Sequence, residues 1–290
     1  MTRGLTIEVR KYFIEKAGNS PEEYEDAADS DRNDSGQRRV VAVADGAAEA
    51  FEARLWAEAL VSTFVGEPPA MDSVDGLLAW LERPVQIWRA GIDWENLRYY
   101  HEEKARRGSF AAFLGAVFTI PGPDQAGDPL PRGEVARYAA VAVGDSCLFH
   151  VRDGALKTHF PVKKASDFGT TPLLLSTSMT HNRVVLGPTI LPPGYVRPGD
   201  RLFLATDALS AWFLGLVEAG ERPWEDLEGL SSDGFAELVI QLRKEGLLRN
   251  DDCTLLVLRV KGGSSRGLGH KPPRITFSSR RAAPPRGERE

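Results

Sequence analysis

Cysteine is scarce in this sequence. Only Cys147 and Cys253 occur among 290 residues, and each stands in an apolar, strand-like segment. Two thiols cannot form a disulfide framework, and no neighbouring residues supply the spacing of a zinc site. We therefore expect both cysteines to be buried and reduced, and the protein to be cytoplasmic.

Long hydrophobic runs are also absent. No apolar stretch approaches the roughly 18–20 residues that a helix needs to span a bilayer. Residues 1–4 lead directly into a strand-like pattern rather than into the apolar core of a signal peptide. The sequence therefore predicts no contact with a membrane.

Positive charge is outnumbered by negative charge except at the C-terminal end. The net charge is −5, but residues 261–290 hold eight Lys or Arg against two Glu, so residues 1–260 carry −11. An acidic body argues against binding nucleic acid over a broad surface. The tail is rich in Pro, Gly, Ser and Arg, which favours disorder, although a basic tether to an acidic partner is an alternative. We expect one domain over residues 1–260 and a separate tail over 261–290.

The hydrophobic pattern within residues 1–260 predicts a mixture of strands and helices. Strands are expected at residues 6–13, 39–44, 110–120, 135–151, 201–206 and 254–260. Helical spacing covers residues 51–64, 74–90, 94–107, 209–219 and 232–245. A Pro- and Gly-rich loop joins the strands at 110–120 and 135–151, which indicates a hairpin. Strands are too many for a βαβ alternation, so we expect a mostly antiparallel α+β domain.

Aspartates border four of these strands. Asp45, Asp145, Asp207 and Asp251 stand at strand ends, and Glu25 and Asp26 form an acidic pair upstream. Each aspartate alone is typical of a turn or a helix cap. If they converge, their repulsion requires bound cations or raised pKa values. Oxygen ligands without His or Cys select hard ions such as Mg²⁺ or Mn²⁺.

Six short motifs occur in a fixed order over roughly residues 5–260. They are residues 24–26 (YED), 42–46 (AVADG), 108–109 (GS), 143–146 (VGDS), 198–200 with 204–207 (PGD and LATD), and 250–254 (NDDCT). In this order and spacing the chain resembles the PPM (type 2C) family of metal-dependent Ser/Thr protein phosphatases, bacterial type. That resemblance implies a four-layer αββα sandwich, in which two mostly antiparallel sheets are flanked by helices.

The resemblance also implies a metal site with two or three Mn²⁺ or Mg²⁺ ions at one end of the sandwich. Asp45 would bridge two ions and Gly46 would offer its carbonyl, while Asp207 and Asp251 would ligate directly. Glu25 and Asp26 would act through bound water, and Asp145 would hold a third ion together with Asp207. Asp45, Asp207 and Asp251 are thus the expected catalytic residues.

The expected reaction is hydrolysis of phosphoserine or phosphothreonine on proteins, with a metal-bridging hydroxide attacking phosphorus in line. Phosphorylated proteins would be the substrates and a Ser/Thr kinase a possible pathway partner, and no nucleic acid or membrane is expected. Residues 160–195 lie where such proteins have a mobile flap. A connecting segment with only a structural role is an equal alternative.

The sequence departs from the family pattern at four places. Pro21 replaces the Arg that commonly binds the substrate phosphate, residues 47–49 (AAE) replace glycines, Ala208 replaces a glycine and Asp252 replaces an asparagine. Arg32, Arg38 or Arg54 could substitute for the missing arginine. Two alternatives to an active phosphatase therefore stay open: a PPM-like interaction module with little catalysis, and an unrelated acidic α+β domain whose aspartates only form turns.

Overall fold

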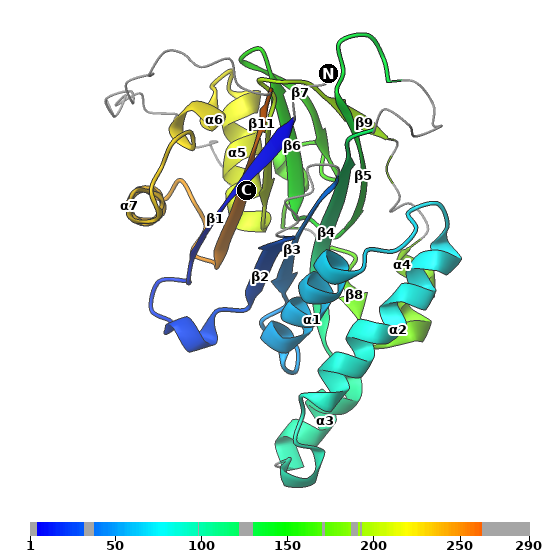
Figure 1. The fold of residues 1–290 in the computed structure, drawn as a ribbon. Coiled ribbons are helices and arrows are strands. Elements are labelled where there is room, and N and C mark those ends of the chain that lie inside the picture. Colours follow the sequence, from blue (N-terminus) through cyan, green and yellow to red (C-terminus); the bar gives the residue numbers. More distant parts are fainter. Residues whose placement is uncertain are drawn as a thin grey trace, which may run out of the picture.

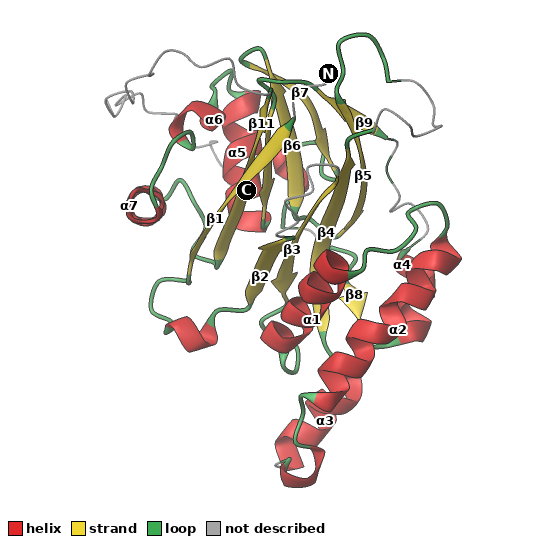
Figure 2. Ribbon diagram, in the orientation of Figure 1, coloured by secondary structure: helices red, strands yellow, loops and turns green. Residues whose placement is uncertain are grey.

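Two antiparallel β-sheets lie face to face, with helices covering their outer surfaces (Figures 1 and 2). The structure is a computed structural model, and it describes residues 5–31, 38–97, 99–121, 130–169, 172–186, 191 and 193–262. Residues 263–290 lie outside the described residues, so the prediction of a disordered tail stays a prediction. None of the described helices is long and apolar enough to pass through a membrane.

The first sheet joins the two ends of the described chain. Its strand order is β1–β11–β10–β6–β7, and every neighbouring pair is antiparallel. The strands are β1 (Thr6–Ile14), β11 (Cys253–Lys261), β10 (Arg201–Ala205), β6 (Cys147–Arg152) and β7 (Ala155–Phe160). β11 pairs with β1 along nine residues, from Lys261 opposite Thr6 to Cys253 opposite Ile14. The division into a domain over residues 1–260 and a separate tail stays a prediction.

The second sheet has the strand order β2–β3–β4–β5–β9, and β8 pairs with β4 beside this path. Its strands are β2 (Asp26–Ser30), β3 (Arg38–Gly46), β4 (Phe110–Thr119), β5 (Ala136–Val143), β8 (Leu175–Ser176) and β9 (Gly194–Val196). The predicted hairpin of β4 and β5 is present, with Phe113 opposite Val143 and Thr119 opposite Arg137.

The side chains of the strands alternate between two apolar layers. In β3, Val41 and Val43 face the other sheet, while Ala42 and Ala44 face the helices. In β10, Leu204 lies between the sheets and Phe203 faces the helices of the other side. Three apolar layers result, namely one between the sheets and one under the helices of each face. The predicted αββα sandwich is confirmed.

The helices fall into two groups on opposite sides of the sheets (Figure 1). One side carries α5 (Asp207–Glu218), α6 (Pro223–Asp226) and α7 (Ser232–Lys244). The other carries α1 (Ala53–Gly66), α2 (Val74–Ala90) and α4 (Met179–Val185), while α3 (Tyr99–Arg107) projects from the end of α2. Short 3₁₀ turns lie at Pro21–Glu23, Trp94–Asn96 and Ala165–Asp167.

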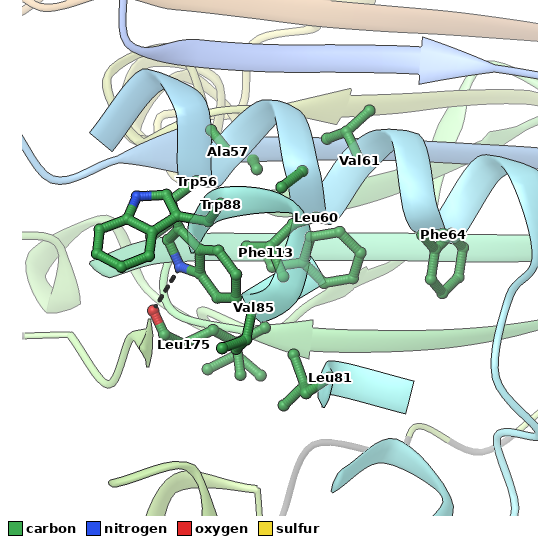
Figure 3. Packing of buried hydrophobic residues seen from close by; sticks show 14 of the residues in the cluster. Trp56, Ala57, Leu60, Val61, Phe64, Leu81, Val85, Trp88, Phe113 and Leu175 are labelled. Atoms are coloured by element: carbon green, nitrogen blue, oxygen red, sulfur yellow. Dashed lines mark hydrogen bonds between the residues drawn. The ribbon is translucent and has the colours of Figure 1, made fainter. Parts of the chain in front are cut away.

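Aromatic side chains fix α1 and α2 on the second sheet (Figure 3). The Phe64 ring meets the Phe113 ring edge-on, with ring centres 5.4 Å apart. The Trp56 indole N–H donates to the carbonyl of Leu175, 3.0 Å away, which attaches α1 to β8. Because α1 follows closely after the end of β3, these contacts hold the Asp45–Gly46 segment in place.

Two predicted elements are wrong in extent. The segment 135–151 is not one strand: it divides at Gly144, whose φ is +95°, and the chain passes there from β5 in one sheet to β6 in the other. A Cβ at Gly144 would lie 2.5 Å from the Cβ of Ala112, so a glycine is required. The helix predicted over 94–107 divides into a 3₁₀ turn and α3, because Leu97 is extended.

A buried ionic network closes the end of the sandwich where β10 begins. Asp200 is 1% exposed, and it accepts hydrogen bonds from His150 Nε2 (2.9 Å), from Arg152 Nε (2.8 Å) and Nη2 (2.6 Å) and from the Arg197 N–H (2.9 Å). Arg152 also binds both carboxylate oxygens of Glu134, at 2.7 and 2.8 Å. Burial alone would raise the pKa of Asp200, but the bonds from His150 and Arg152 hold it below its usual range.

This network predicts a stability loss in Asp200→Asn. The amide cannot neutralise Arg152, so we expect the free energy of unfolding to fall by about 3 kcal/mol at pH 7. A lowered folded-state pKa stabilises above the unfolded-state pKa of about 4 and is lost as pH falls further. Urea unfolding between pH 3 and 7 should therefore show the difference between wild type and variant shrinking below about pH 4. Asp153→Asn, which removes an exposed partner of Arg197, should change stability little at any pH.

Candidate functional site

The antiparallel pairing brings the predicted acidic residues to one end of the sandwich. In the first sheet β10 runs toward Asp207, whereas its two neighbours start at that end, directly after Asp145 and Asp251. In the second sheet Asp45 lies opposite Asp26, because β3 ends where β2 begins. Neighbouring strands run in opposite directions, so a strand that leads into an aspartate lies next to strands that begin at or after one. All these aspartates therefore lie at the same end of the sandwich.

Hydrogen bonds join the two sheets at this end. Asp26, on the second sheet, is 4% exposed, and its Oδ2 accepts a bond of 2.7 Å from the Thr254 hydroxyl on the first sheet. The Thr254 N–H in turn donates to the Thr206 hydroxyl at 3.0 Å, and the Tyr24 hydroxyl contacts that of Thr254. The position of Asp26 is therefore set by residues of the opposite sheet.

Asp252 fixes the segment that carries Glu25. Its two carboxylate oxygens accept the backbone N–H groups of Lys16 and Glu25, at 2.8 and 2.7 Å. A carboxylate can accept at both oxygens, whereas an asparagine can accept at only one. The aspartate at this position thus has a structural role in attaching the β1–β2 connection to the start of β11.

Gly46 permits a close approach at the end of β3. A Cβ at this position would lie 2.7 Å from the Glu25 carbonyl oxygen and 2.9 Å from that of Ala53. Both distances are shorter than real Cβ contacts, so any other residue would push the strands apart. The absence of a side chain keeps Glu25 and Asp45 in neighbouring positions.

The gathered carboxylates raise one another's pKa values. Burial raises the pKa of Asp45 well above its usual range, and the charges of Asp26, Asp207, Asp145 and Asp251 raise it further. These five aspartates are called the aspartate cluster below. Within it, burial followed by the charge of Asp207 raises the pKa of Asp145 to about 6. The cluster is a region in which additional negative charge is costly.

Asp26, Asp207 and Glu25 show the same effect. Burial raises the pKa of Asp26, although the bond from the Thr254 hydroxyl acts in the opposite direction. Burial also raises the pKa of Asp207 against the lowering effect of Arg249. Beside the cluster, burial and the charges of Asp252 and Asp251 raise the pKa of Glu25 to about 7.

One positive side chain lies against the cluster. The guanidinium of Arg249 donates from Nη2 to Asp207 Oδ2, and the same nitrogen lies 3.1 Å from Asp251 Oδ2. Arg249 was not predicted from the sequence. The available signal was its position two residues before Asp251, in the segment that leads into β11.

The aspartate cluster fits divalent cations in its chemistry. Its donors are carboxylate oxygens, and the raised pKa values of Asp45 and Asp145 indicate that the site gains by positive charge. Among the residues that the structure describes, no three His, Cys, Asp or Glu side chains already have the spacing of a coordination sphere. The guanidinium of Arg249 contacts Oδ2 of Asp207 and Oδ2 of Asp251, which are oxygens that a cation would use.

Comparison with known proteins gives the fold. No family profile and no curated protein matches the sequence. Among solved structures, the Ser/Thr phosphatase Stp1 from Staphylococcus aureus superimposes with a TM-score of 0.55 and 14% identity, covering 90% of this chain and 98% of that chain. The catalytic domain of the Ser/Thr protein phosphatase PstP, solved with two manganese ions, gives 0.51 and 18%, covering 89% and 99%. The chain has the PPM phosphatase fold.

The S. agalactiae Ser/Thr phosphatase is a third structure of this fold, with a TM-score of 0.50, 13% identity and coverage of 88% and 100%. Against the PPM pattern, the departures of this chain have local explanations. Pro21 begins a 3₁₀ turn that Ser20 and Glu23 close through a 2.9 Å bond. Ala208 is 2% exposed and packs in the apolar layer beneath α5, so its methyl group is accommodated.

Of the arginines proposed as substitutes, the structure describes Arg38 and Arg54, and neither forms an ion pair with the aspartate cluster. Arg38 begins β3, at the opposite end from Asp45. Arg54 pairs with Glu58 and donates to the Glu22 carbonyl at 3.2 Å. Arg32 lies outside the described residues.

The segment predicted as a flap is attached beside the cluster. Asn182 of α4 bonds both the N–H and the carbonyl of Ser176 in β8, each at 2.8 Å, and β8 pairs with β4 at Ala111. The Leu173 carbonyl lies 3.3 Å from the position of a Cβ on Gly144, next to Asp145. These contacts favour the structural interpretation of the described part of this segment.

The repulsion within the cluster predicts a stability gain in Asp45→Asn without metal. A carboxyl whose folded-state pKa is raised destabilises the fold as pH rises above its unfolded-state pKa of about 4. In a chelating buffer at pH 7 to 8 the variant should be more stable than wild type by on the order of 1–2 kcal/mol, and the two should converge near pH 4. Urea unfolding across this range measures the difference.

A control for this prediction is Asp29→Asn, on the same strand pair. Asp29 is about half exposed and pairs with Lys11, so its replacement should give a small loss at pH 7 rather than a gain. An Asp45→Asn variant that is less stable than wild type in chelator would contradict the electrostatic account of the cluster.

Proposed function

We propose that this protein is a metal-dependent phosphatase that hydrolyses phosphomonoesters, most specifically phosphoserine and phosphothreonine on proteins. The observation that carries the proposal is the aspartate cluster at one end of a sandwich with the PPM fold. The Ser/Thr phosphatases Stp1 and PstP, which share the fold, support the substrate class.

The residues of the cluster suit two or three Mn²⁺ or Mg²⁺ ions. Asp45, with the Gly46 carbonyl, and the carboxylates of Asp207 and Asp251 would hold the ions directly, while Glu25 and Asp26 would act through water and Asp145 would share an ion with Asp207. The two manganese ions in the PstP structure support this number and this metal. When bound, such ions acidify water and neutralise phosphoryl oxygens.

The chain itself positions these carboxylates. The Thr254 hydroxyl holds Asp26, and Asp252 fixes the backbone of Glu25. Neither Asp26 nor the Glu25 backbone therefore has to become ordered when a cation binds. Asp207 is the first residue of α5, where the positive end of the helix dipole favours its ionised form. Preorganised ligands reduce the entropy that binding would otherwise lose.

The protein's thiols argue for direct hydrolysis rather than a covalent intermediate. Cys147 and Cys253 both begin strands at this end of the sandwich, but both are buried, and burial raises their pKa values to about 12. Thiols that stay protonated at neutral pH are poor nucleophiles. Attack on phosphorus by a water-derived hydroxide is therefore the favoured route.

The partners follow from this substrate class. Phosphorylated proteins would be the substrates, and a Ser/Thr kinase would supply them. Because both cysteines are free and buried, we propose the cytoplasm as the compartment and a signalling pathway as the context.

The proposal predicts manganese-dependent hydrolysis of p-nitrophenyl phosphate and of a phosphothreonine peptide. Activity should appear with Mn²⁺ and disappear with EDTA. Asp45→Asn and Asp207→Asn should each reduce kcat/KM by at least about 100-fold, because each removes a proposed metal ligand. Steady-state assays with purified protein measure these effects.

Asp153→Asn is the matched control, since this exposed aspartate pairs with Arg197 at the opposite end of the sandwich and should leave activity unchanged. Full activity in EDTA would overturn the metal dependence. Binding of Mn²⁺ without hydrolysis of either substrate would instead favour the non-catalytic PPM-like module.

A further inference from the structure

Arg249 is anchored through the residues on either side of it. Leu248 is 5% exposed and packs in the apolar layer beneath α5 and α7. Asn250 exchanges two hydrogen bonds with the backbone of Ala17, at 2.8 and 3.1 Å. The backbone position of Arg249 is therefore fixed next to the aspartate cluster.

The side chain of Arg249 is free to leave. It is 51% exposed, whereas the carboxylate of Asp207 that it contacts is only 15% exposed. Its polar contacts are with Asp207 and Asp251, and both are made through the single atom Nη2. A long side chain held by one terminal nitrogen can rotate into solvent without moving the backbone.

Arg249 differs from the other described Lys and Arg side chains in that it forms ion pairs with the aspartate cluster. Among the described residues, no other Lys or Arg forms an ion pair with Asp26, Asp45, Asp145, Asp207 or Asp251. A guanidinium keeps its charge at every pH at which proteins fold. The cluster thus has one permanent positive partner of its own.

We propose that Arg249 is the built-in counter-cation of the aspartate cluster, and that it competes with divalent cations for the oxygens of Asp207 and Asp251. This inference rests on the proposed function, because it assumes that the cluster binds such cations. An N–H donor and a cation cannot share the same oxygen lone pairs. Binding of metal at Oδ2 of Asp207 therefore requires the guanidinium to leave that oxygen.

Two opposite effects follow from this competition. Without metal, Arg249 offsets part of the repulsion among the aspartates and stabilises the fold. With metal, the same contacts must be lost, so Arg249 weakens the observed affinity. The side chain thus sets the concentration of divalent cation at which the site becomes filled.

The experiment compares wild type with Arg249→Gln in the full-length protein. Calorimetric titration with MnCl₂ should show roughly tenfold tighter binding by the variant, because charge-assisted hydrogen bonds no longer compete. In EDTA the variant should melt at a lower temperature than wild type. The rise in melting temperature at saturating Mn²⁺ should then be larger for the variant.

Two further variants make the result specific. Arg83→Gln removes the same charge from an exposed pair with Glu67, and it should change neither the Mn²⁺ affinity nor the response to EDTA. Arg249→Lys keeps the charge but offers a different donor geometry, so its affinity should lie between those of wild type and Arg249→Gln. It also serves as the test if Arg249→Gln does not fold.

The outcomes separate this inference from the proposed function. If wild type binds Mn²⁺ and the Arg249 variants bind it equally or more weakly, the competition is wrong while the proposed function stands. If neither wild type nor any variant binds Mn²⁺, the proposed function fails and this inference fails with it. Tighter binding in Arg249→Gln together with lower stability in EDTA supports both.

Discussion

Repulsion among carboxylates at one end of the sandwich is the interaction on which the rest of this structure depends. Asp45 lies within the influence of four other aspartates, in surroundings that exclude much of the solvent. Such an arrangement is unfavourable unless positive charge or proton uptake relieves it. The fold nevertheless maintains it, with the Thr254 hydroxyl, the glycine at position 46 and the backbone anchors of Asp252 all holding acidic groups close to one another.

At the other end of the sandwich, acidic groups are neutralised by side chains of the protein itself. There Asp200 and Glu134 are buried too, but Arg152 binds both of them and His150 completes the set. Asp200, Glu134 and Arg152 each have a charged partner from the chain, as is expected of a structural network. This contrast between a paired ionic network and the aspartate cluster supports the proposed cation site independently of the comparison with phosphatases of known structure.

The sequence predicted individual strands and helices better than the points at which the chain passes from one sheet to the other. Continuous apolar strands such as residues 39–44 and helical spacing such as residues 74–90 correspond closely to β3 and α2, because periodicity depends only on neighbouring residues. The division of residues 135–151 at Gly144 was missed, since both halves are apolar and a single glycine gives a weak signal. Strand order was beyond reach, because pairing of β1 with β11 joins residues from opposite ends of the domain.

For the candidate site, the acidic residues could be named from sequence motifs, but their convergence could not be deduced. It follows from the alternation of antiparallel strands, which places Asp145 and Asp251 beside Asp207. Their roles as metal ligands stay predictions. Arg249 went unnoticed because a solvated arginine next to a strand is ordinary in sequence, and only its contact with two carboxylates distinguishes it.

The bond between Asp26 and Thr254 has a consequence for how this protein can move. Asp45 lies near the end of β3 in one sheet and Asp207 follows β10 of the other, so the spacing between them depends on how the two sheets are held together. Any sliding of one sheet over the other would change the distances among the carboxylates of the aspartate cluster. The Asp26–Thr254 hydrogen bond restrains that motion at the cluster. The geometry of the aspartate cluster and the packing of the two sheets are therefore linked.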